Sequence, residues 1–122
     1  MEKDAWIDFK IKLRDRLKTF AINILELSAE FPDNPRSRVL NYQLTKAGTS
    51  AYANYRASLR GRSKAEFFSK LSISVEEADE SEMWLDLIIS TKLIENERVI
   101  KLYDESLELI KMLSSLRKKM TE

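Results

Sequence analysis

The sequence predicts an all-α protein: an up-down-up-down antiparallel bundle of four helices. Apolar residues recur every three or four positions along most of the chain, which is the period of an amphipathic helix. Only two glycines and two prolines occur in 122 residues, so there is little material for turns. No stretch shows the strict alternation that is typical of a half-buried strand. The whole chain, 1–122, is therefore expected to form a single domain of long helices.

The first helix is predicted over residues 4–31. Pro32 lacks the backbone N–H that a helix interior needs, so it should stop the helix. Successive apolar residues are spaced by 4, 3, 4, 3 and 4 positions, which places them on one face: Leu13, Leu17, Phe20, Ile24, Leu27 and Phe31.

The second helix is predicted over residues 35–60, after the turn "PDNPRS". Asn34 is suited to cap it, with Pro35 at its first position. Gly61 would end it in the left-handed conformation that glycine adopts readily. Its apolar face would carry Leu40, Leu44, Ala47, Ala51 and Tyr55.

The third and fourth helices are predicted over residues 63–92 and 96–120. Ser63 and Glu66 fit a capping box, and Asn96 is a suitable cap for the fourth helix. The apolar residues of the third helix are Phe68, Leu71, Val75, Ala78, Leu85 and Ile89. Those of the fourth are Val99, Tyr103, Leu107, Ile110 and Leu113.

The composition argues against most catalytic sites. The chain has no cysteine and no histidine, which removes the thiolate ligands, the commonest general base and the commonest transition-metal ligand. The acidic run over residues 76–82 scatters around its helix, so it is interpreted as a solvated face. We expect no enzyme, no catalytic residue, no metal and no cofactor. The charged N-terminus and the short apolar runs indicate neither a signal peptide nor a membrane span, so a cytoplasmic protein is expected.

A basic stripe is predicted on the second helix, opposite its apolar face. At 100° per residue, its members fall in an arc about 80° wide that contains no acid, and two of them continue it around the turn. Cations neutralise phosphates, and an exposed aromatic ring can stack on an unpaired base. The stripe therefore predicts a nucleic-acid interface. Its residues are Arg38, Tyr42, Lys46, Arg56, Arg60, Arg62 and Lys64.

A second interpretation of the basic stripe is equally open. Residues 1–70 hold fourteen Lys/Arg and eight Asp/Glu, a net charge of +6, whereas residues 71–122 hold seven and twelve, a net charge of −5. The stripe could therefore pair with acids of a neighbouring helix or subunit. The protein would then be a structural or scaffolding oligomer that binds another protein.

Two residues of the predicted helices need a structural reason. Gly48 lies inside a helix, where glycine costs about 1 kcal/mol relative to alanine, so a close helix crossing is expected there. Glu82 projects from the middle of the apolar arc of the third helix. It is predicted to be a buried structural carboxylate within reach of Gln43, Tyr103 and Ser106, because a buried carboxylate must be paired or protonated.

The third helix also has apolar residues on its far side, namely Ile73, Trp84 and Leu87. A monomeric bundle needs only one apolar stripe per helix. The excess predicts a second buried surface and hence a homo-oligomer with these residues in its interface.

Three stretches carry a family resemblance: "YQLTKAGTSAYANYRAS", "SKAEFFSKLSISVEEADESEMWLDLI" and "LYDESLELIKMLSSL". They resemble the bacterial four-helix-bundle proteins named for 23S rRNA intervening sequences, from about Phe9 to Leu116. Tyr52 replaces a residue that is usually small in the family, and Ala57 stands where an acid commonly follows the arginine.

The resemblance implies a closed ring of subunits, usually five, and no established enzymatic activity. By fold-level analogy it extends to the accessory protein of diversity-generating retroelements, a basic pentameric barrel that binds nucleic acid and a reverse transcriptase. The expected partners are therefore further copies of the chain, RNA or another nucleic acid, and a protein, but no membrane.

Overall fold

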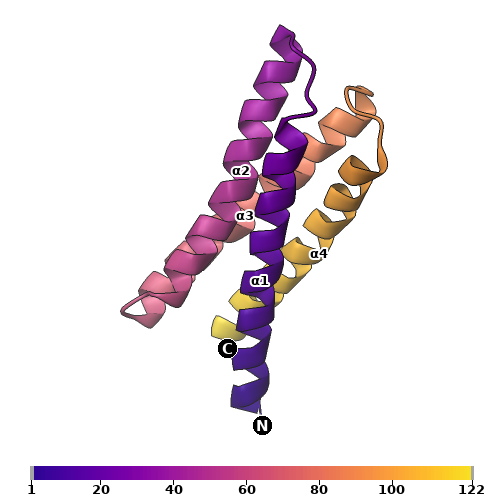
Figure 1. Ribbon diagram of the computed structural model, residues 1–122. Coiled ribbons are helices and arrows are strands. Elements are labelled where there is room, and N and C mark those ends of the chain that lie inside the picture. Colours follow the sequence, from indigo (N-terminus) through magenta and orange to yellow (C-terminus); the bar gives the residue numbers. More distant parts are fainter. Residues whose placement is uncertain (1, 122) are drawn as a thin grey trace.

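The computed structural model describes residues 2–121 and shows four α-helices, with no strand among those residues (Figure 1). The helices are α1 (Glu2–Ser28), α2 (Pro35–Leu59), α3 (Lys64–Ser90) and α4 (Glu97–Met120). Met1 and Glu122, the ends of the predicted domain, lie outside the described residues.

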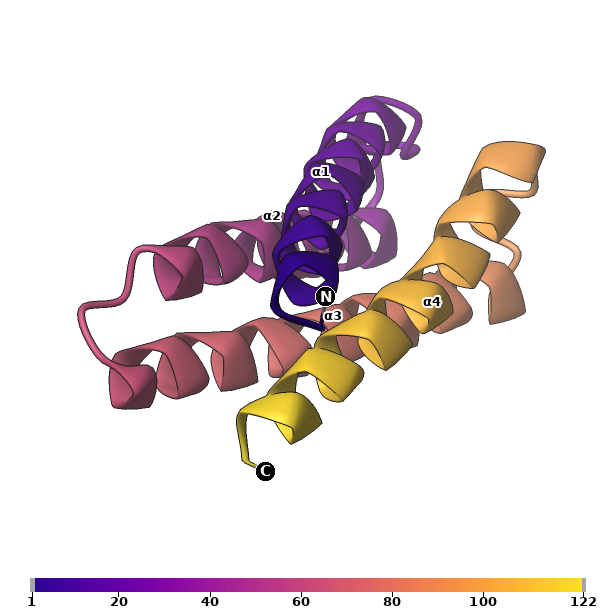
Figure 2. The same ribbon diagram turned by 90° about the horizontal axis from the view of Figure 1, so that it is seen from below.

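The helices form an antiparallel bundle in which neighbours in the chain are neighbours in space. Helix α1 contacts α2, α2 contacts α3, α3 contacts α4, and α4 returns to α1. The diagonal helices α1 and α3 are farther apart and meet through side chains, with Lys10 lying 4.9 Å from the centre of the Phe67 ring. The pair α2–α3 shares the most extensive contact and the pair α1–α4 the least. Figure 2 shows the α2–α3 turn reaching well to one side of α1. The predicted all-α fold and helix order are confirmed.

Three helix starts are capped by the residues that the sequence indicates. The Asn34 side chain accepts a hydrogen bond from the Ser37 N–H at 2.9 Å. Ser63 accepts one from the Glu66 N–H at 3.1 Å, and Asn96 accepts one from the Val99 N–H at 3.0 Å. Each cap satisfies a backbone donor that has no partner within its helix.

Two helix ends differ from the prediction. Helix α1 ends at Ser28, three residues before Phe31, and tighter turns follow in which the Glu30 N–H bonds to the Leu27 carbonyl at 2.8 Å. The third helix ends at Ser90, and Lys92 follows with a left-handed φ of 57°. No other non-glycine residue has a positive φ among residues 2–121.

The prediction that Gly61 is a left-handed cap is wrong, because no described glycine has a positive φ. Glycine is needed at position 61 because the backbone atoms of neighbouring residues leave no room for a side chain. A Cβ at this position would lie 3.0 Å from the Phe67 nitrogen and 3.2 Å from the Ser58 carbonyl oxygen. Glycine therefore lets the first turn of α3 fold back closely on the end of α2.

The predicted apolar faces of α1 and α2 supply about half of the core, including Leu17, Ile24 and Tyr55, which are fully buried. Helix α4 is turned from its predicted orientation. Leu102 and Leu109 are buried, whereas the predicted core residue Leu107 is exposed. On α3 the predicted core residue Phe68 is likewise exposed. Both helices are apolar over a broad arc, so periodicity alone did not determine which part of the arc faces inward.

Candidate nucleic-acid interface

All seven residues of the predicted basic stripe are exposed on the outer side of α2 and the α2–α3 turn. The side chain of Tyr42 is 63% exposed, which leaves a face of its ring open. The helix positions them because its opposite side is held in the core by Leu44, Ala51 and Tyr55. The predicted amphipathic orientation of α2 is thus present.

The first half of the stripe is already partly neutralised. The Arg38 guanidinium pairs with Asp33 at 2.6 Å, from the loop that precedes α2. Lys46 lies 6.0 Å from the centre of the Tyr42 ring and close enough to Glu77 on α3 to lower the pKa of that carboxyl. The stripe contains no acid within its own helix, but the preceding loop and α3 supply acids beside it.

Glu77 lies beside two other acids of α3, Glu76 and Glu80. Burial raises the pKa of the Glu77 carboxyl, and the neighbouring negative charge of Glu80 raises it further. The ammonium group of Lys46 opposes this shift, without reversing it. The α2–α3 surface near Lys46 is therefore of mixed charge.

The second half of the stripe is different, and we call it the turn cluster: Arg56, Arg60, Arg62 and Lys64. Within the described part of the chain, none of these side chains forms an ion pair, and all four are exposed. The Arg56 guanidinium lies 5.7 Å from the centre of the Tyr52 ring, and the nearby Glu66 carboxylate accepts the Arg62 backbone N–H at 3.2 Å. This leaves four cationic groups around one turn available to an anionic partner.

A shallow groove of about 390 Å³ runs beside Arg38, Tyr42 and Lys46. Its floor includes two residues that sequence reasoning missed, Asn41 and Thr45. Asn41 Nδ2 donates to the Ser28 carbonyl at 3.1 Å, and the Thr45 hydroxyl donates to Asn41 Oδ1 at 3.1 Å. The i, i+4 spacing of these two polar residues beside the stripe was the available signal.

The prediction that Glu82 is buried is wrong: its side chain is partly exposed, and Ser81 occupies the core position. Ser81 can be buried because its hydroxyl donates to the Glu77 carbonyl at 2.8 Å. Of the predicted partners, Tyr103 does lie beside Glu82, and the negative charge of Glu82 is the main cause that raises the pKa of the Tyr103 phenol.

Gly48 is buried, and the predicted close approach occurs there. A Cβ at this position would collide with the Ile24 Cδ1 atom of α1. The predicted interface residues Ile73, Trp84 and Leu87 lie on the outer part of α3. Leu87 is exposed, whereas Ile73 and Trp84 are half-buried and Trp84 packs against the core.

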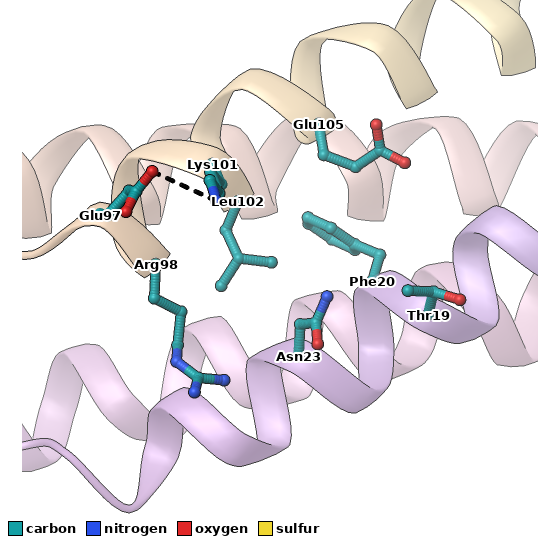
Figure 3. Close-up of a pocket in the computed structure, with 8 residues that line it drawn as sticks. All are labelled: Thr19, Phe20, Asn23, Glu97, Arg98, Lys101, Leu102 and Glu105. Carbon is teal, nitrogen blue, oxygen red and sulfur yellow. Dashed lines mark ion pairs between the residues drawn. The ribbon is translucent and has the colours of Figure 1, made fainter.

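A larger groove, of about 510 Å³, lies between α1 and α4 (Figure 3). Its charged groups are paired within the protein: Lys101 with Glu97 at 3.2 Å, and Arg98 with Glu26 at 2.8 Å. Arg16 at the far end forms a two-pronged ion pair with Glu105, which raises the pKa of the guanidinium. The pairs of Arg98 and Arg16 join α1 to α4, whereas that of Lys101 lies within α4, and together they leave little positive charge for an external anion.

Residues 2–121 contain neither a cluster suited to a metal ion nor a helix suited to a membrane. No group of three or more acidic, cysteine or histidine residues there is arranged to hold a metal ion. No helix in the same range is both long and apolar enough to cross a membrane.

Comparison with known proteins agrees with the resemblance seen in the sequence. The family described as 23S rRNA-intervening sequence protein matches residues 10–115. A crystal structure of a protein of unknown function from the S23 ribosomal protein family of Bacteroides thetaiotaomicron is 33% identical, with a TM-score of 0.83. The match covers 90% of this chain and 98% of that one. No curated protein matches.

Proposed function

Because the chain belongs to the 23S rRNA-intervening sequence protein family, we propose that it is a non-enzymatic, self-assembling accessory protein that binds RNA. The observation that carries this proposal is the turn cluster, Arg56, Arg60, Arg62 and Lys64, which is exposed and has no ion-pair partner among the described residues. Neutralising phosphates is the use that best fits such a group of cations. Tyr42 and Tyr52 add aromatic surface on which an unpaired base can stack.

The proposed assembly is a ring of five subunits, as the resemblance implies. A ring repeats the turn cluster in each subunit, so weak contacts with one RNA molecule add through multivalency. The proposal includes no catalytic residue and no cofactor, in keeping with a chain that has neither histidine nor cysteine. Its expected location is the cytoplasm, where ribosomal RNA and its precursors are found in bacteria.

The test is RNA binding measured over a salt series. Replacing both Arg56 and Arg60 with Ser should lower the affinity about tenfold or more and reduce the dependence of binding on salt, because fewer counterions are released. The matched control is the replacement of Arg38 and Lys46 with Ser, which removes the same charge. It should have a smaller effect, because Arg38 is paired with Asp33 and Lys46 lies beside Glu77.

Tyr42 provides a second arm of this test. Replacing it with Ala should weaken binding to single strands more than binding to duplexes, since stacking requires an unpaired base. Equal loss for both forms of RNA would contradict a stacking role. Retained RNA affinity in the Arg56 and Arg60 double variant would overturn the assignment of the turn cluster.

A structural or scaffolding oligomer that binds another protein is the alternative function. The observation that favours it is the partial neutralisation of the stripe by Asp33 and Glu77. In that case the protein should not bind RNA at physiological salt, and loss of Arg56 and Arg60 should loosen the assembly instead.

A further inference from the structure

Helix α1 carries a second apolar face, which points away from the core. Four large aliphatic residues on it are between 44% and 52% exposed, and we call them the α1 stripe: Ile7, Ile11, Ile22 and Leu25. At 100° per residue they lie on a different side of the helix from the buried Leu13, Leu17 and Ile24. Lys18 is exposed in the middle of the stripe and forms no ion pair within residues 2–121. The stripe consists of two exposed aliphatic pairs, Ile7 with Ile11 and Ile22 with Leu25, separated by charged residues, and exposed aliphatic groups rimmed by charge are typical of a protein contact.

A complementary surface lies on the outer side of α3 and α4. Its apolar members are 38–46% exposed: Phe68, Ile100 and Leu107. Three carboxylates, Glu82, Asp86 and Asp104, surround Tyr103 and together raise the pKa of its phenol. In the region that the structure describes, no cation pairs with any of the three. We call these residues the α3–α4 face.

Corresponding residues of the α1 stripe and the α3–α4 face lie at the same level along the bundle axis. The ion pair of Arg16 with Glu105 and that of Arg98 with Glu26 set the register of α1 against α4. These pairs place Lys18 level with Asp104, and Ile22 level with Ile100.

At the other end of the bundle, Lys119 of α4 lies 6.0 Å from the centre of the Trp6 ring on α1. Phe68 shares a small groove with Met120 and Thr121 at that same end of α4. Ile7 therefore lies at the same level as Phe68. The apolar residues of the two surfaces thus lie at matching levels at both ends of the bundle, and Lys18 lies at the level of the carboxylates between them.

We propose that the α1 stripe of one copy packs against the α3–α4 face of the next copy, with Lys18 among the carboxylates Glu82, Asp86 and Asp104. The inference rests on the proposed self-assembly and goes beyond it by naming both contact surfaces. Rotation about an axis parallel to the bundle keeps every residue at its height, so surfaces that match in height meet in a ring. Such a contact joins two different surfaces and closes on itself when the rotation fits.

This arrangement is compatible with RNA binding at the turn cluster. Helices α1 and α3 sit on a diagonal and approach each other through side chains, with Lys10 lying 4.9 Å from the centre of the Phe67 ring, and the two surfaces point away from this approach. Of the turn cluster, Lys64 borders the α3–α4 face, because it lines the same small groove as Phe68, whereas Arg56 and Arg60 lie on α2 or at its end and belong to neither surface. An assembly built in this way leaves Arg56 and Arg60 open to solvent in every subunit.

The test is a charge exchange across the proposed contact, read by light scattering over a range of protein concentrations. Lys18→Glu should raise the concentration needed for half-assembly about tenfold or more, because it sets a fourth carboxylate among three. Asp104→Lys should act similarly by opposing Lys18. The two changes together should restore most of the assembly. Arg36→Glu is the matched charge reversal at an exposed cation of α2, outside both surfaces, and should have no comparable effect.

The aliphatic contact is tested by replacing Ile22 and Leu25 together with Ser, which should also dissociate the assembly while helicity is retained. If the wild-type chain stays monomeric, self-assembly itself is refuted. If it assembles and neither the charge exchange nor the aliphatic variant changes this, only the named contact is refuted. Dissociation by Trp84→Glu but by none of the α1 variants would likewise overturn it, in favour of the patch around Trp84.

Discussion

At the scale of single residues, Gly48 allows the close approach of α2 to α1. Gly48 is buried where α2 passes α1, and the side chain that occupies the space beside it is Ile24, which is fully buried. A glycine inside a helix lowers its stability, so its presence at this position is explained by the neighbouring isoleucine and by no property of α2 itself.

Gly48→Ala should destabilise the protein by about 1 kcal/mol, because the cost of overpacking exceeds the gain in helix propensity. In an Ile24→Val background the colliding δ-methyl is absent. There the same change should be neutral or should stabilise the protein by up to about 1 kcal/mol. Denaturant unfolding of the four proteins checks this. An equal effect in both backgrounds would show that Ile24 is not the obstacle.

Tyr55 is the largest fully buried side chain, and its hydroxyl donates to the Lys10 carbonyl at 2.7 Å. Burial raises the pKa of this phenol above its usual value of about 10, and the positive charge of Arg14 only partly opposes the shift. The folded protein therefore holds a proton at this position that the unfolded chain releases at high pH.

Tyr55→Phe should lower the free energy of unfolding at neutral pH by about 1 kcal/mol through loss of the hydrogen bond. Above a pH of about 10 the unfolded chain binds fewer protons than the folded one, so wild-type stability should fall as pH rises. The variant lacks this contribution and should lose less stability between pH 9 and 11. Tyr52→Phe, at a half-exposed position, is the control and should follow the wild type.

At the scale of the elements, the connection between α3 and α4 is the one with backbone strain. Its Lys92 has a left-handed φ of 57°, although the sequence offers no glycine there. A side chain in this conformation costs roughly 1–2 kcal/mol. The turn is nevertheless formed, with the Leu93 N–H bonded to the Ile88 carbonyl at 3.1 Å.

Lys92→Gly should raise the free energy of unfolding by about 0.5–1 kcal/mol, since glycine adopts this conformation without strain. The neighbouring Thr91 has an ordinary right-handed φ of −85°. Thr91→Gly should therefore lower stability, which makes it the matched control. Thermal or denaturant unfolding distinguishes the two, and a loss of stability in Lys92→Gly would contradict the account.

At the scale of the whole molecule, α1 is the helix held least firmly. Its contact with α4 is the least extensive of the four, and it includes the ion pairs of Arg16 and Arg98. Helices α2 and α3 are joined along their length by the most extensive contact. Local opening is easiest where few apolar contacts hold an element.

Backbone amides in the middle of α1 should consequently exchange with solvent faster than those in the middle of α2 and α3. Hydrogen exchange followed by mass spectrometry at low protein concentration measures this directly. If the α1 stripe is covered by a second copy, protection of α1 should increase as concentration rises, whereas protection of α2 should not. Uniform protection of all four helices would show that the α1–α4 contact is as firm as the others.

The helix starts and the basic stripe are the parts that could be predicted from the sequence. Asn34, Ser63 and Asn96 act as caps because a cap is a local interaction, made within one turn of the residue that forms it. The outward orientation of Arg56 and Arg60 followed from the apolar residues on the other side of the same helix. The pairing of Arg38 with Asp33 did not follow from the helical period, because Asp33 lies in the loop before α2, where that period does not apply.

The sequence by itself thus determined that the chain forms four long helices, how each one begins, and which side of α2 is basic, since these depend on residues within a turn or two of one another. Only the tertiary structure decided how α3 and α4 are rotated, with Ser81 buried in place of Glu82 and Leu109 in place of Leu107. The physical reason is that a broadly apolar helix can bury several alternative faces, and the choice depends on the shape of neighbours that are distant in the chain.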